Sequence, residues 1–124
     1  LNGTHTITIE VSDGKASATF TATFTKAVHK ATITLKTPLA VSGDITAAVM
    51  SVVGQIPAGA VYKVEATNNA KDTSPVWQAE VKSGANIVFK NKTAVNGAAF
   101  NFRITVERGT SAGGYISGVS GAFQ

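Results

Sequence analysis

The sequence contains no cysteine and only two histidines, and these absences narrow the chemistry that the chain can carry. Without cysteine there is no disulfide framework, no thiolate nucleophile and no cysteine zinc site. His5 and His29 lie far from an HExxH spacing, so little remains for a metal centre. We therefore expect neither a metal site nor a bound cofactor.

Catalytic motifs are missing as well. The sequence has no P-loop, no GxGxxG fingerprint, no GxSxG elbow and no EF-hand loop. The carboxylates include no Glu-x-Glu or Asp-x-Asp pair, although pairing in space is not visible in a sequence. They are Glu10, Asp13, Asp44, Glu65, Asp72, Glu80 and Glu107. We expect a protein that is not an enzyme and has no catalytic residue.

Charge is scarce, at 15% of residues, whereas apolar residues make up 44%, so the chain is too apolar to be disordered and should fold. The net charge is +4, but the eleven lysines and arginines are spread along the chain. Nucleic-acid binding requires a basic cluster, so we expect a solvated surface and no nucleic-acid partner. No stretch approaches the roughly 20 apolar residues of a membrane span, and we expect no membrane insertion.

The length of 124 residues fits one domain of ordinary size. The first residues, LNGTHTITIE, lack the basic and then apolar pattern of a signal peptide and resemble the middle of a strand. We expect a mature product or a fragment of a longer polypeptide.

Residues 1–27 carry the clearest local pattern, two alternating runs separated by Asp13-Gly14. Asp-Gly favours a two-residue hairpin turn because both central positions need positive φ. Pairing Ser12 with Lys15 places Ile7 opposite Phe20, so that one face is wholly apolar and the other is rich in threonine. A lone hairpin is marginal in water. We therefore expect the apolar face to be buried, either by the rest of the chain or by another chain, and we take these residues as a candidate assembly face: Ile7, Ile9, Val11 and Phe20.

The rest of the chain alternates in short runs with turn residues between them and shows no convincing helix. Strands are predicted over residues 31–37, 45–56, 60–69, 76–84, 86–91, 99–109 and 114–123. About seven short strands are typical of an antiparallel immunoglobulin-like or fibronectin-type-III-like β-sandwich. The predicted fold class is therefore all-β, with a hairpin over residues 1–27 and a sandwich over residues 28–124.

Three aromatic side chains are candidate surface-binding residues. Trp77, the only tryptophan, either fills the core between two sheets or stacks on a sugar ring beside its polar loop. The pattern favours the core. Tyr62 and Tyr115 carry the same two interpretations, and Tyr115 is the better surface candidate because glycines lie near it on both sides.

Several stretches resemble known proteins. NGTHTITIEVSDGKASATFTATFTK resembles the closing hairpin of bacterial and phage immunoglobulin-like repeats. IPAGAVYKVEATNNAKDTSPVWQ, FKNKTAVNGAAFNFRITVERG and GGYISGVSGAFQ resemble the C-terminal module of minor structural proteins, tail or fibre, from phages and prophages of Gram-positive bacteria. The resemblance implies a virion structural module that projects from the particle and aids attachment to the host cell surface. Its implied partners are other virion proteins or copies of itself, and a host glycan.

Two other functions stay open. The first is a carbohydrate-binding module with Trp77, Tyr62 or Tyr115 as a stacking platform, which a glycan array with Trp77→Ala would test. The second is a bacterial surface adhesin or pilus-like subunit whose N-terminal hairpin completes the sandwich of a neighbour. The expected location is accordingly the extracellular virion surface, or else the bacterial cell surface.

Overall fold

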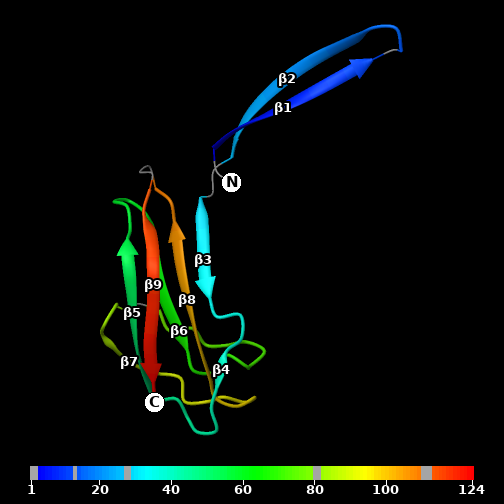
Figure 1. Cartoon of the computed structure of the whole chain (residues 1–124). Helices are drawn as coiled ribbons and strands as arrows, with labels where there is room; N and C mark the ends of the chain where they lie inside the picture. Colours follow the sequence, from blue (N-terminus) through cyan, green and yellow to red (C-terminus); the bar gives the residue numbers. More distant parts are fainter. Residues whose placement is uncertain (1–2, 13, 27–28, 80–81, 110–112) are drawn as a thin grey trace.

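The computed structural model describes residues 3–12, 14–26, 29–79, 82–109 and 113–124. Every regular element in these residues is a β-strand (Figure 1). The strands are β1 (Gly3–Ser12), β2 (Ser17–Lys26), β3 (Lys30–Thr34), β4 (Leu39–Ala40), β5 (Ala47–Gln55), β6 (Val61–Thr67), β7 (Asn86–Val88), β8 (Ala99–Glu107) and β9 (Tyr115–Phe123).

Among the described strands the first two pair only with each other, and they project from the rest of the chain as an arm (Figure 1). The predicted hairpin is confirmed, but its predicted register is wrong. Ser12 pairs with Ser17, two residues later than predicted, so Phe20 lies opposite Ile9 and not Ile7. Because side chains alternate with a period of two, a shift of two residues leaves each one on its predicted face.

The shift lengthens the loop of the hairpin from two residues to four, residues 13–16. Gly14 has a φ of 85°, which favours glycine, and its N–H donates to the Ser12 side-chain oxygen at 3.2 Å. Asp13 lies outside the described residues. Four-residue loops are a common hairpin connection, so the Asp-Gly signal locates the turn without specifying its length.

Strands β3 to β9 form two antiparallel sheets packed face to face. In the four-stranded sheet β8 is central, with β6 along one edge and β3 followed by β4 along the other. In the three-stranded sheet β5 lies between β7 and β9. Phe100 of one sheet stacks on Phe123 of the other at 5.0 Å between ring centroids. The prediction of an all-β antiparallel sandwich is confirmed.

The core lies between these two sheets and follows the alternation of the strands. On β8, Phe100 and Ile104 are buried inward while Arg103 between them faces outward beside Glu65 of β6. The inward position of Met50 on β5 is 1% exposed. The buried apolar cluster consists of Ile45, Ala48, Met50, Val64, Ala66, Ile87, Phe89, Ala98, Phe100 and Ile104.

The finer immunoglobulin-like or fibronectin-type-III-like assignment is not confirmed. In an immunoglobulin constant domain the first strand pairs with the second, and the last pairs with the strand before it. Here the first sandwich strand, β3, pairs with β8, and the last strand, β9, pairs with β5. The predicted boundary between residues 27 and 28 lies outside the described residues.

Three predicted strands differ from the structure. The strand expected over residues 31–37 ends at Thr34, and the chain pairs with β8 again only at Leu39–Ala40. The strand expected over residues 76–84 is wrong, because among its described residues only Gln78 forms an isolated bridge, to Ala66. The run over residues 86–91 is a strand only at Asn86–Val88.

The break between β3 and β4 is held by Asn101 of β8. Its side-chain Oδ1 accepts hydrogen bonds from the Leu35 N–H and the Thr34 hydroxyl, both at 3.1 Å. Its Nδ2 donates to the Leu35 carbonyl at 3.2 Å. Asn101 is 8% exposed, so the amide replaces backbone pairing that the chain lacks at this point.

We expect Asn101→Ala to destabilise the sandwich by about 2 to 3 kcal/mol, because both backbone groups of Leu35 lose their partner in a partly buried position. Urea unfolding followed by the fluorescence of Trp77 measures this loss. Asn86→Ala, at an exposed position of β7, is the matched control and should change the free energy of unfolding by less than about 0.5 kcal/mol. Equal effects of the two variants would contradict the assigned role.

Candidate functional site

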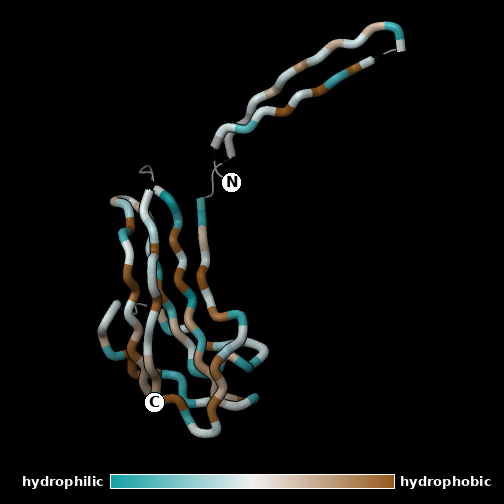
Figure 2. The backbone as a smooth tube through the Cα atoms, in the orientation of Figure 1, coloured by the Kyte–Doolittle hydropathy of each residue, from teal (hydrophilic) through white to brown (hydrophobic). Residues whose placement is uncertain are grey.

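The apolar face of the hairpin is the first candidate surface, and it is open. Apolar residues recur along both hairpin strands, with no other element over them in Figure 2. The exposed fractions are 49% for Ile7, 50% for Ile9, 56% for Val11 and 59% for Phe20. The expectation that the sandwich of the same chain buries this face is therefore wrong. Burial by another chain is the alternative that is left.

The opposite face of the hairpin is a ladder of hydroxyls. Thr6 pairs with Thr23, Thr8 with Thr21, and Glu10 with Thr19. Cross-strand threonine pairs stabilise a sheet while their hydroxyls face water. The hairpin is thus strongly amphipathic, with one face suited to water and the other suited to burial.

A charged cluster on the outer face of the four-stranded sheet contacts Trp77 through Arg103. Glu65 of β6 accepts a hydrogen bond from Arg103 Nε at 2.6 Å and pairs with Lys63 Nζ at 2.8 Å. The Arg103 guanidinium lies over the Trp77 ring, 4.4 Å from its centroid. Trp77 is half-buried on this outer face and lies outside the core cluster, so the favoured interpretation of it as a core residue between the sheets is wrong.

The loop that carries Trp77 is anchored on both sides of this residue, at Val76 and at Gln78. The Val76 N–H donates to Asn69 Oδ1 at 2.9 Å, and Gln78 exchanges two backbone hydrogen bonds with Ala66. The Gln78 side chain also bonds to the backbone on either side of Phe89, at Val88 and Lys90. These bonds hold the indole against Arg103, where a cation and an aromatic face attract each other.

The ion pair lowers the pKa of Glu65. The hydrogen bond from Arg103 is the largest cause and the one from Lys63 adds to it, while burial opposes both. A carboxyl whose pKa is depressed in the folded state stabilises the fold above its unfolded pKa, and that contribution disappears as the pH falls through the folded value. The cluster therefore stabilises the fold near neutral pH, and this stabilisation decreases in acid.

We expect Glu65→Gln to cost roughly 1 kcal/mol near neutral pH, because Arg103 is more than one-third exposed and water screens the pair. The variant should also lose less stability than the wild type as the pH falls below about 4.5, the ordinary value for this carboxyl. Urea midpoints measured across this range test both statements. Curves that stay parallel down to acid pH would contradict the second statement, and equal midpoints near neutral pH would contradict the first. Asp72, whose pKa is also lowered, keeps part of the acid dependence in both proteins.

A second polar network was not predicted from the sequence. It is built on Asn68 and Asn69, at the end of the run predicted as a strand over residues 60–69. Asn68 is 6% exposed, and its Nδ2 donates to the carbonyls of Ile45 and Asn91 at 2.9 Å. Asn69 Nδ2 donates to Asp72, whose carboxylate also accepts the backbone N–H groups of residues 95 and 96. The network joins three loops at one end of the sandwich.

The three aromatic candidates lie in different surroundings. Trp77 lies on the outer face with Arg103. Tyr62 is on β6 opposite Val106 and is 39% exposed, and partial burial raises the pKa of its hydroxyl. Tyr115 opens β9 opposite Gln55 and is 61% exposed. No contact between any two of these rings is found in the described part of the chain, so a shared stacking platform is not formed.

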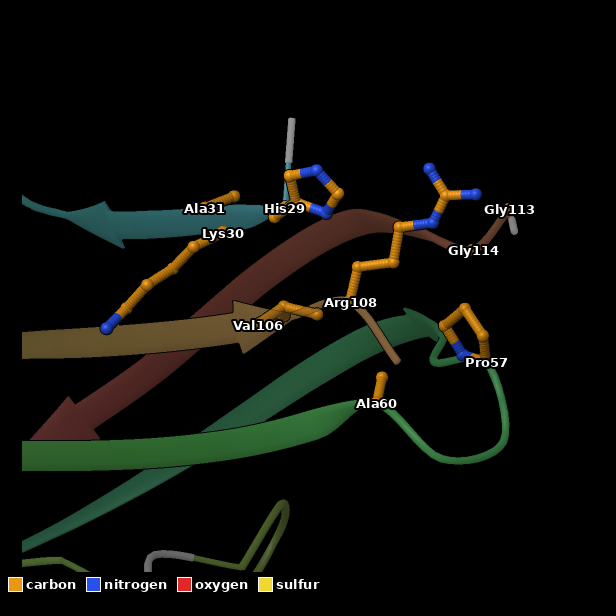
Figure 3. Close-up of a pocket in the computed structure, with 9 residues that line it drawn as sticks. All are labelled: His29, Lys30, Ala31, Pro57, Ala60, Val106, Arg108, Gly113 and Gly114. Carbon is orange, nitrogen blue, oxygen red and sulfur yellow. The ribbon is translucent and has the colours of Figure 1, made fainter. Parts of the chain in front are cut away.

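A groove lies where β3 and β9, the edges of the two sheets, come close at the end of the sandwich from which the hairpin leaves. Figure 3 shows its wider part, with Ala31 and Val106 along the strands, Pro57 on the facing turn, and Lys30 and Arg108 extending beyond them. This part encloses about 300 Å³.

The groove continues between the two sheets through a narrower, more apolar section of about 230 Å³. Ile33 of β3, together with Ile116 and Tyr115 of β9, lines this section, which shares Pro57 and Val106 with the wider part. We call the two sections together the β3–β9 groove. It has an apolar lining and a cationic rim.

Within the described residues, no group of three or more histidine, aspartate or glutamate side chains is arranged to hold a metal ion. The same part of the chain contains no helix of the length and hydropathy needed to cross a membrane. No protein-family model, curated protein or solved structure matches the chain.

Proposed function

We propose that this chain is a non-enzymatic structural module of a phage particle, a fibre, tail or capsid-surface component that assembles through its N-terminal hairpin and aids attachment to the host cell surface. The observation that carries the proposal is the projecting hairpin, whose apolar face is half exposed (Figure 1). The resemblance of the sequence to phage minor structural proteins supplies the kind of assembly.

The physical argument concerns what an uncovered hairpin needs. Two strands alone are marginally stable in water. The exposed parts of Ile7, Ile9, Val11 and Phe20 add no hydrophobic stabilisation to the hairpin until another surface covers them. Fully burying an exposed side chain of this kind contributes about 1.5 to 3 kcal/mol, and these half-exposed side chains have roughly half of that left to gain. Four such side chains on one face therefore favour the binding of another chain there, while the threonine face stays in contact with water.

The carbohydrate-binding alternative has less support. One face of Trp77 is occupied by Arg103. The neighbouring amides that a sugar would need are engaged within the protein: Gln78 bonds to Val88 and Lys90, and Asn91 bonds to Asn68 and Thr93. A stacking platform with convergent free hydrogen-bonding groups is the usual form of such a site, and this arrangement lacks the second part.

Immunogold electron microscopy with antibodies raised against the purified chain tests the proposal on the source phage particle. We expect gold on the outside of the particle, and we expect the purified protein to bind Gram-positive cells. Unlabelled particles, together with a protein that stays monomeric and ignores the cells, would overturn it. Labelled bacterial surfaces without particles would favour the adhesin alternative.

A further inference from the structure

The two sheets of the sandwich do not cover each other fully. Residues directly opposite each other on paired strands share one face of the sheet. Ile33 of β3 pairs with Ile104, and Leu39 of β4 pairs with Phe100, so both face the same side as buried core residues. Ile104 and Phe100 are 0% and 5% exposed, whereas Ile33 and Leu39 are 39% and 49% exposed.

The difference arises because the three-stranded sheet ends at β9. Among the described strands β9 pairs only with β5, so its other edge has no strand beside it. The β3–β9 groove runs along this side and is lined by Ala31 and Ile33 from one sheet and by Tyr115 and Ile116 from the other. One more strand beside β9 would lie over β3 and cover this apolar strip.

The edge of β9 lacks two of the usual defences against pairing, although a register shift opposite Val53 and Gly54 interrupts its ladder with β5 near its start. Natural edge strands carry lysine, proline or inward-pointing charges that discourage another strand from joining them. β9 spans nine residues, YISGVSGAF, with no charged residue and no proline. Its exposed edge is therefore open to β-augmentation, in which an added strand gains main-chain hydrogen bonds.

We infer that the edge of β9 and the β3–β9 groove form the acceptor for the N-terminal hairpin of a second copy of this chain. The inference rests on the proposed function, because it names the partner that the hairpin binds. The hairpin strands have ten residues each, against nine in β9. With its apolar face turned inward, the hairpin places Ile7, Ile9 and Phe20 over Ile33 while its threonine face extends the outer surface.

A contact of this kind is heterologous, since the hairpin of one copy meets the groove of the next. Such contacts build rings or open filaments, and a reciprocal exchange of hairpins between two copies closes as a dimer. The hairpin points away from its own sandwich (Figure 1), which favours a second copy over folding back.

Disulfide trapping tests the acceptor in the full chain, which has no native cysteine to interfere. Thr19→Cys, Thr21→Cys and Thr23→Cys on the outer face of β2 are each mixed with a chain that carries Ser120→Cys on the outer face of β9. Ser120 lies opposite Ser51, away from the core, and is exposed. We expect at least one of the three mixtures to give a disulfide-linked heterodimer.

The matched control is Val88→Cys on β7, at the opposite edge of the same sheet and 66% exposed. Linkage to Val88→Cys as efficient as linkage to Ser120→Cys would overturn the inference. So would an intrachain disulfide in a dilute chain that carries both Thr21→Cys and Ser120→Cys, because it would show the hairpin folding onto its own sandwich.

A second measurement separates failure of this acceptor from failure of the proposed function. Ile33→Lys should weaken self-association of the full chain at least tenfold with an unchanged circular dichroism spectrum, whereas Val88→Lys should not. If the chain associates through the hairpin but Ile33→Lys has no effect and no cysteine pair links, the acceptor is wrong and assembly through the hairpin stands. A chain that never associates contradicts both.

Discussion

Replacing Ile9 with lysine is expected to weaken self-association of the chain by roughly tenfold to a hundredfold and to leave the sandwich folded. Ile9 lies in the centre of the hairpin face opposite Phe20 and is 50% exposed in the single chain. Burying the half of Ile9 that is exposed contributes roughly half of the ~1.5 to 3 kcal/mol that a whole side chain gives, and each ~1.4 kcal/mol is a factor of ten in the association constant. A buried lysine charge adds a further cost.

Thr8→Lys is the control for this substitution, because Thr8 is the neighbouring residue on the opposite, hydroxyl-bearing face. Sedimentation equilibrium of both variants beside the wild type measures the association constants. The Thr8 variant should stay within about threefold of the wild type. If Ile9→Lys associates as tightly as the wild type, the apolar face is not the assembly surface.

Phe89→Ala is expected to destabilise the sandwich by about 3 to 5 kcal/mol, the usual cost of truncating a buried aromatic residue. Phe89 is the largest fully buried side chain, at 1% exposure, and directly follows β7. A domain of this size has a total stability of about 5 to 15 kcal/mol. The variant therefore loses a large share of its stability and should unfold at a much lower denaturant concentration.

The adjacent Val88→Ala is the control, because Val88 faces outward and is 66% exposed. Urea unfolding, monitored by the fluorescence of Trp77, compares the two variants. Val88→Ala should lower the free energy of unfolding by less than about 0.5 kcal/mol. A loss below about 1 kcal/mol for Phe89→Ala would show that the two sheets do not enclose this ring.

The amphipathic hairpin was predictable because alternation is local. The order of apolar and threonine residues determines both strands and both faces without reference to the rest of the chain. Its register was predicted wrongly because a slip of two residues preserves the faces and exchanges one Ile–Phe pair for another. Pattern alone does not distinguish Ile7 from Ile9 as the partner of Phe20.

The parts that depend on distant residues were missed. The pair of Glu65 and Arg103 requires β6 and β8 to be neighbours in register, which no spacing in the sequence reveals. The run over residues 76–84 alternates like a strand, but its backbone is anchored at Gln78 and its Trp77 ring packs on Arg103.

The apolar face of the strip on β3 and β4 can be predicted from the sequence, but its exposure cannot. Ala31, Ile33 and Leu35 alternate with polar residues as one apolar face, but nothing in a single sequence tells how many strands the opposing sheet has. The offset of the sheets appears only when Ile33 is compared with its partner Ile104. A surface for assembly is thus built from a residue pattern that looks like an ordinary core strand.

Hydrogen–deuterium exchange of the full chain at two concentrations tests the central claim most directly. A hairpin without a partner is marginal and exchanges its amides quickly. We predict slow exchange in β1 and β2 at high concentration and fast exchange on dilution, with β9 following the same change and β8 unaffected. Exchange in the hairpin that is fast at every concentration, or slow and independent of dilution, would contradict assembly through this face.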